Sequence, residues 1–152
     1  MPQILWRETA RSCVGAVDDR EMLVRIEKLP QIPQRPMTVR AHSPVGVAVV
    51  LWCGDPEEAA GNHLVEWTVD QDILWGRNTQ PAALAAPGLW QEGDRVVMRG
   101  QLHLTEDGAA YLHVGDSSIL FDLASPIPAS VDRTWVEVSV EAENVALYPY
   151  RI

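Results

Sequence analysis

The amino-acid sequence predicts an all-β fold, a small and mostly antiparallel β-barrel with two short helices. Apolar and polar residues alternate along most of the chain, as they do in strands that bury one face. Helix start and stop signals occur in only two short stretches. The chain has 152 residues, 47% of them hydrophobic, which is enough to bury a core. We therefore expect one domain, with N-terminal strands in residues 1–29, a proline-rich connector in 30–44 and the barrel core in 45–152.

The first third of the chain contains two expected strands and the connector. Residues 22–27 alternate between apolar and polar side chains, which predicts a half-buried strand. Four prolines follow within residues 28–44. Because proline fixes φ and lacks a backbone N–H, this stretch is expected to be extended, with at most a short edge strand near residues 37–40. Residues 45–52 are apolar throughout, which is typical of a central strand buried on both faces.

Two segments carry the signals of short helices. Residues 54–61 begin with Asp55 in the position of an N-cap and Pro56 in the first turn, which predicts a one-turn helix. Further along, Thr79 is placed to cap a second short helix over the alanine-rich residues 81–86. A Pro-Gly pair then ends this second helix.

The remaining elements are expected to be strands. Alternation recurs in residues 64–70 and 134–140, and residues 95–104 and 110–123 are expected to form two further strands around a turn at residues 107–108. A last strand or tail ends near residues 147–150. Together these segments give six to eight strands in the barrel.

The hairpin around Gly108 can be assigned a register. A two-residue turn would pair Leu102 with His113, whereas a three-residue loop over 106–108 with a left-handed Gly108 pairs Leu102 with Leu112. The second register keeps the apolar residues on one face, so burial should select it. Its other face is either solvated or a binding face for an anionic or hydrogen-bond-rich small ligand. The candidate ligand-binding residues are Arg99, Gln101, His103, Tyr111 and His113.

Charge is distributed unevenly. The net charge is −9, with +2 in residues 1–40 and −11 in residues 41–152. Six carboxylates and no Lys or Arg occur between residues 54 and 72. This segment is either a solvated face or a docking surface for a basic protein. The candidate partner-binding residues are Asp55, Glu57, Glu58, Asp70, Asp72 and Trp75.

One segment resembles a known family. Residues 92–102, EGDRVVMRGQL, followed by a hairpin, resemble the later strands of OB-fold domains of the single-stranded-DNA-binding-protein type, and the likeness extends over about residues 65–122. The resemblance implies an OB-like barrel that binds oligonucleotides. The residues of this chain that would contact phosphate under that hypothesis are Arg77, Arg95 and Arg99. The acidic charge of the segment opposes this function, because phosphate contacts supply most non-specific affinity.

No linear motif of catalysis or metal binding is present. Cys13 and Cys53 lie in apolar settings without paired spacing, so we expect buried, inert thiols, and we expect no catalytic residue, metal or cofactor. The longest apolar run, residues 45–53, is too short to span a bilayer, and no signal sequence is evident. We expect a cytoplasmic protein that does not bind membranes.

These observations favour a non-catalytic binding module that recognises another protein through an acidic surface. Two alternatives stay open. The first is an oligonucleotide-binding OB-fold domain, which the resemblance implies. The second is a small β-barrel enzyme, since a site inside a barrel lumen leaves no linear signature.

Overall fold

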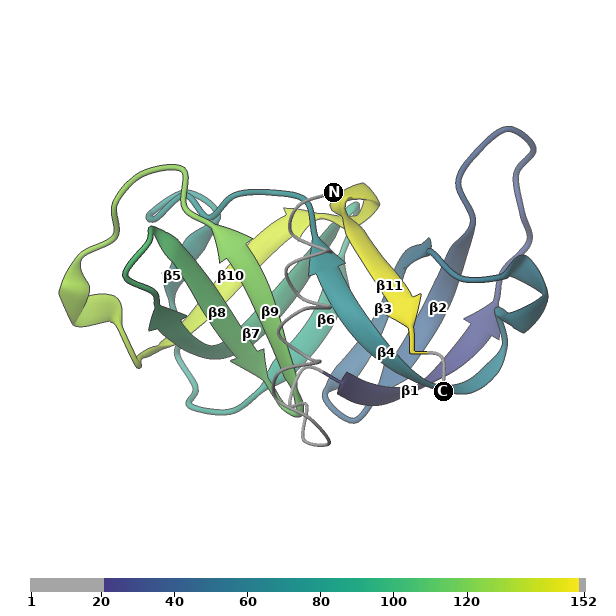
Figure 1. Ribbon diagram of the computed structural model, residues 1–152, viewed down its shortest axis with the longest axis horizontal. Coiled ribbons are helices and arrows are strands. Elements are labelled where there is room, and N and C mark those ends of the chain that lie inside the picture. The colour runs from purple at the N-terminus through teal and green to yellow at the C-terminus, as the bar shows by residue number, and fades with distance from the viewer. Residues whose placement is uncertain (1–20, 151–152) are drawn as a thin grey trace.

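The computed structural model describes residues 21–150 and confirms the all-β class (Figure 1). These residues form eleven strands and three one-turn 3₁₀ helices. The strands are β1 (Glu21–Lys28), β2 (Thr38–Ser43), β3 (Gly46–Trp52), β4 (Gly61–Val69), β5 (Thr79–Pro81), β6 (Gly88–Glu92), β7 (Arg95–Leu104), β8 (Ala109–Val114), β9 (Ser117–Asp122), β10 (Trp135–Glu141) and β11 (Val145–Pro149). The helices are η1 (Pro56–Glu58), η2 (Ala129–Val131) and η3 (Ala142–Asn144).

Five strands close into a barrel. β1 pairs with β2 and β2 with β3, both antiparallel. β3 then pairs in parallel with β11, β11 is antiparallel to β4, and β4 returns to β1. This closed five-stranded ring is compatible with an OB-like fold. Closure leaves none of these five strands as a free edge.

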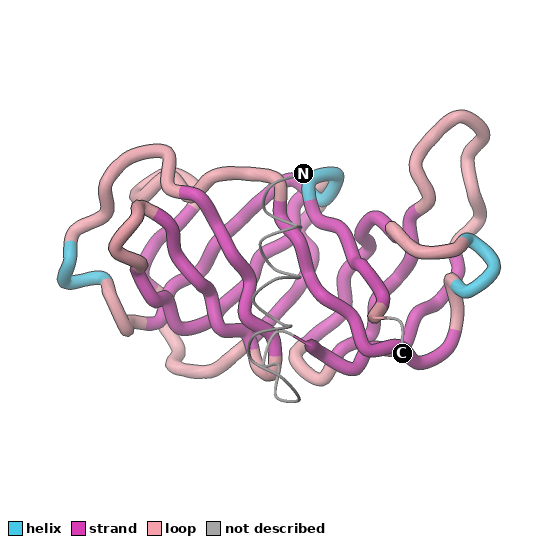
Figure 2. Tube along the Cα trace, in the orientation of Figure 1, coloured by secondary structure: helices cyan, strands magenta, loops and turns pink. Residues whose placement is uncertain are grey.

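The chain between β4 and β11 builds a second group of strands around β7. One edge of β7 pairs with β10, and the other pairs first with β6 and then, beyond Gly100, with β8. At the change of partner a Cβ on Gly100 would lie 2.2 Å from the carbonyl oxygen of His113, so only glycine fits. β9 pairs with β8 and lies against β4 of the barrel. In Figure 2 the strands of both groups run side by side, with the loops at their ends.

One continuous core joins the barrel and the second group of strands. Burial alternates along β1 and β10, as the sequence predicts. On β4 the predicted alternation is wrong in its second half: Glu66 and Thr68, expected to face solvent, are buried, on a strand against which β9 packs. Trp67 on β4 and Phe121 on β9 are among the largest fully buried side chains. The single-domain assignment itself stays a prediction.

Two strands of the barrel differ from the sequence-based prediction. β2 pairs on both sides, so the expected edge strand near residues 37–40 is wrong, and the prolines at 33 and 36 lie in the loop before it. β3 is buried on one face only; Val47, Val49 and Leu51 point outward and are at least partly exposed. The reason is closure, because a strand in a small barrel has an inner and an outer face.

The second group of strands also contains corrections. The expected helix over residues 81–86 does not form; β5 pairs with β10, and a loop follows in which the N–H of Ala82 donates to the carbonyl oxygen of Trp135 (3.0 Å). Sheet pairing here overrides the helix propensity of alanine. Residues 110–123 form two strands, because Gly115, with φ of +60°, allows a two-residue turn.

The resembling segment lies outside the closed ring. Residues 92–102 are in β6, β7 and their turn, and within residues 65–122 only β4 belongs to the barrel. The barrel is therefore OB-compatible through β1 to β4 and β11, and not through β6 and β7, which carry the resembling motif.

Candidate binding cleft

The candidate site lies where β3 changes its neighbour. On the edge away from β2, β3 pairs with β6 at Gly46 and with β11 from Leu51. Between these two points the N–H of Val49 donates to the side-chain oxygen of Gln91 on β6 (2.8 Å). The side chain of Gln91 thus takes the place of a neighbouring strand at this fork in the sheet.

A cleft of about 640 Å³ opens at the fork, and we call it the fork cleft. Residues 49–51 of β3 line it, together with the end of the β1–β2 loop, the β6–β7 turn and η3. Its lining consists of Arg35, Pro36, Thr38, Val49, Val50, Leu51, Gln91, Asp94, Glu141, Ala142, Glu143 and Asn144. Of these residues, none is aromatic.

The fork cleft is acidic. Among the described residues, three carboxylates and one cation, Arg35, line it. Glu141 is already paired, because its carboxylate accepts a hydrogen bond from Arg95 at 2.6 Å. Within residues 21–150, no hydrogen bond or ion pair engages the carboxylates of Asp94 and Glu143, both of which are exposed. These two groups are therefore available to a cationic ligand.

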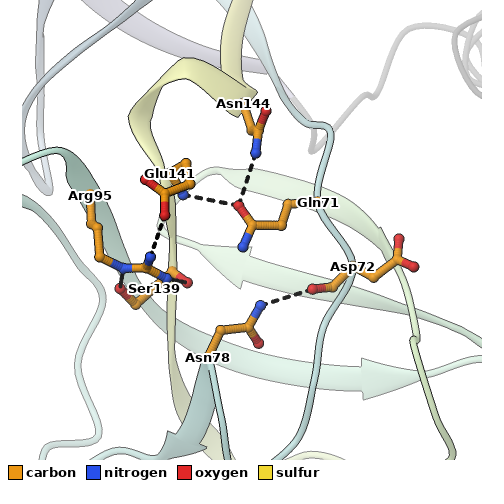
Figure 3. Close-up of polar contacts among 7 residues, drawn as sticks. All are labelled: Gln71, Asp72, Asn78, Arg95, Ser139, Glu141 and Asn144. Carbon is orange, nitrogen blue, oxygen red and sulfur yellow. Dashed lines mark hydrogen bonds and ion pairs between the residues drawn. The ribbon is translucent and has the colours of Figure 1, made fainter.

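A polar network fixes the η3 side of the cleft (Figure 3). The side-chain oxygen of Gln71 accepts hydrogen bonds from the N–H of Glu141 (2.9 Å) and from the amide of Asn144 (3.1 Å). Arg95, besides its bond to Glu141, donates to the hydroxyl of Ser139 at 2.8 Å. The carboxylate and amide that line this wall are thus held before any ligand arrives.

A second charged group lies on the outside of β1 and β2. The carboxylate of Glu27 accepts hydrogen bonds from Arg40 (3.1 Å) and from His42 (2.9 Å). These contacts, His42 first, hold the pKa of Glu27 below its usual range. Arg40 and His42 also lie next to β3, because they pair with Val49 and Val47 in the β2–β3 register.

We expect Glu27→Gln to lower the urea midpoint of unfolding slightly at neutral pH. A carboxyl whose pKa is lower in the folded state stabilises the fold above its unfolded pKa, about 4.3 for glutamate. That contribution is lost as the pH falls through the lowered folded pKa of Glu27. Urea titrations of both proteins from neutral to acid pH should therefore converge in acid, and a constant difference across the range would contradict this account.

The register expected for the β7–β8 hairpin is confirmed. Leu102 pairs with Leu112, Gly108 has φ of +85°, and the rings of His103 and His113 meet edge to face at 4.4 Å. The five candidate residues of this hairpin therefore share one face of the sheet.

Several of the five hairpin residues already bind other parts of the chain. Arg99 donates to the carbonyl oxygen of Ala86 (2.8 Å). Gln101 donates to the carbonyl oxygen of Arg133 (2.9 Å), and His113 shares a hydrogen bond with the hydroxyl of Ser118. A ligand on this face stays a prediction.

The acidic segment is divided by a strand. Asp55, Glu57 and Glu58 are exposed around η1, where Asp55 caps the helix as predicted by accepting the N–H of Glu57 (3.0 Å). Asp70 and Asp72 follow the other end of β4, whose nine residues span roughly 30 Å. Half-buried Trp75 packs against the core instead of standing free. The candidate partner-binding residues therefore do not form one continuous surface.

Two further expectations concern cysteines and metals. Cys53 is exposed just beyond the end of β3, so its expected burial is wrong, and Cys13 lies outside the described residues. In the part of the chain that the structure describes, no group of three or more His, Cys, Asp or Glu side chains is arranged to hold a metal ion. Nor does that part contain a helix of the length and apolarity needed to cross a membrane.

The fork cleft was missed by the sequence-based reasoning. Three of the four charged residues that the structure describes in its lining, Arg35, Asp94 and Glu143, come from three connections that are far apart in the chain. Such a set has no linear spacing to recognise, and only the pairing of β3 with both β6 and β11 brings the connections together. Comparison with protein-family models, with curated proteins and with solved structures finds no match to this chain.

Proposed function

We propose that the protein is a non-catalytic binding module that recognises a basic segment of another protein in the fork cleft. The observation that carries this proposal is an open cleft lined by Asp94 and Glu143, two carboxylates without a partner among residues 21–150, and by the apolar side chains of Val49 and Leu51. A lysine or arginine suits such a lining, since its stem packs on apolar surface while its charged head binds a carboxylate.

The position of the cleft supports a binding role. OB-fold domains bind ligands over their second and third strands and the loops that join strands 1–2 and 4–5. The corresponding parts here are β2, β3, the β1–β2 loop and the chain between β4 and β11. All four contribute to the lining of the fork cleft.

The wider charge distribution supports a basic partner. Residues 21–150 carry eighteen Asp and Glu against eight Lys and Arg. The negative electrostatic potential of these residues speeds the approach of a cationic partner and repels polyanions. Within this proposal the exposed acids around η1, at residues 55–58, form a second contact for basic residues that flank the bound segment.

An oligonucleotide-binding domain of the single-stranded-DNA-binding-protein type is the second candidate, favoured by the same position on the barrel. Binding of an oligonucleotide requires free cationic side chains for the phosphates, and this chain provides few of them at the expected positions. Arg95 pairs with Glu141 (2.6 Å) and Arg99 with Glu137 (3.5 Å), so two of the three arginines expected to bind phosphate are engaged. The described residues of the lining also include no aromatic side chain on which an unpaired base could stack.

The proposal is tested by the affinity of the full chain for an acetylated, amidated Gly-Lys-Gly-Arg-Gly peptide, measured by NMR titration. Asp94→Asn combined with Glu143→Gln should weaken binding by about five- to tenfold, since each exposed charge pair contributes up to about 1 kcal/mol. Arg35→Gln should strengthen it by about two- to fivefold, because a like charge is removed.

The matched control is Glu106→Gln combined with Asp116→Asn, which removes two exposed carboxylates that do not line the cleft. It should change the affinity much less than the cleft variant. Equal weakening by both variants would mean that only net charge matters. Saturable, steeply salt-dependent binding of a single-stranded oligonucleotide at low micromolar protein, without peptide binding, would favour the second candidate.

A further inference from the structure

The outer face of β3 is unusual for a barrel strand with one side in solvent. Its outward residues Val47, Val49 and Leu51 are all apolar, and Val47 is 42% exposed. Outward positions of such strands are normally polar, as they are along β2 next to it. Val49 and Leu51 line the fork cleft, and Val47 continues the row beyond it. We call these three residues the β3 strip.

The polar neighbours of the β3 strip are drawn away from it. By register, Arg40 and His42 on β2 lie beside Val49 and Val47. Both of these polar side chains bind Glu27 on β1, on the opposite side of β2 from β3. Among the described residues, these contacts therefore leave the β3 strip uncovered on its β2 side.

The spacing of the strip matches an extended chain. Alternate residues of a strand lie about 6.6–6.8 Å apart, and the side chains on one face of an extended ligand have the same period. A segment lying along β3 with its basic residue in the fork cleft would bring apolar side chains, at alternate positions, onto the strip. The carboxylates of Asp94 and Glu143 fix which end of the strip the basic residue occupies.

We propose that the β3 strip selects the partner: an extended protein segment with a lysine or arginine followed or preceded, at alternate positions, by branched apolar residues. This inference rests on the proposed function, because the basic residue anchors the segment in the fork cleft. The strip adds apolar contact beyond the cleft and so discriminates between basic segments of equal charge.

The test compares peptides of equal charge on the full chain by NMR titration. The probes are acetylated, amidated Lys-Ser-Val-Ser-Val, its reversed sequence, and Lys-Ser-Ser-Ser-Ser. One of the two valine peptides should bind the wild-type protein about three- to fivefold more tightly than the serine peptide. Val47→Thr, which keeps the shape of the side chain and removes its apolar character, should abolish this preference without changing the affinity for the serine peptide.

The matched control is Leu23→Thr, which removes an exposed apolar side chain (56% exposed) from β1, outside the β3 strip. It should leave the preference intact. Equal binding of all three peptides, or a preference that survives Val47→Thr, would overturn the inference while leaving the proposed function standing. Absence of binding by every lysine peptide would overturn both.

Discussion

Replacing Gly46 by alanine is expected to lower the free energy of unfolding by about 4 kcal/mol or more, or to prevent folding. Gly46 has φ of +147°, a conformation that residues with a Cβ rarely adopt. A Cβ at this position would lie 1.6 Å from the carbonyl oxygen of Leu89, at the one point where β3 pairs with β6. The clash is with backbone, so it can be relieved only by separating the two strands.

The control for this prediction is Gly93→Ala in the β6–β7 turn. Gly93 also has a positive φ (+61°), but a Cβ there meets nothing within 4 Å. Its substitution should cost only the conformational strain, about 1–2 kcal/mol. Urea denaturation of the two variants measures both effects. Similar, small losses in the free energy of unfolding of the two variants would contradict the assignment of Gly46 as the point where β3 meets β6.

The second large effect is expected at Trp67. This side chain is 1% exposed and is part of the common core, so Trp67→Ala should cost about 3–5 kcal/mol through the cavity it leaves. Its indole N–H is buried and finds no hydrogen-bond partner within residues 21–150. Trp67→Phe keeps most of the packing and removes this unsatisfied donor, so its cost should be much smaller. Thermal or urea unfolding should show that the alanine variant is far less stable than the phenylalanine variant. Equal losses in the free energy of unfolding would contradict this account.

Local patterns predicted many of the strands. The alternation along β1 and β10 indicates correctly which residues are buried, because burial of one face selects a period of two. On β4 the same rule places Glu66 and Thr68 in solvent, and both are buried. The register of the β7–β8 hairpin follows from the same rule applied to Leu102 and Leu112. The cap at Asp55 depends only on neighbouring residues and was equally predictable.

Features that depend on distant pairing were not predictable. The outward valines of β3 have the composition of a strand buried on both faces, and only the closed barrel shows that one face is exposed. The alanine-rich loop after β5 has high helix propensity, which pairing with β10 overrides. The fork cleft arises from the change of partner along β3, and no local signal marks such a change.

The central claim is that the fork cleft binds a basic protein segment. Chemical-shift mapping of the full chain with the Lys-Ser-Val-Ser-Val peptide and its reversed sequence tests it most directly. The account predicts that the largest changes fall on the backbone amides of Thr38, Val49 and Asp94, around the cleft. Changes centred instead on the β7–β8 hairpin face, or confined to the acidic residues around η1, would contradict it.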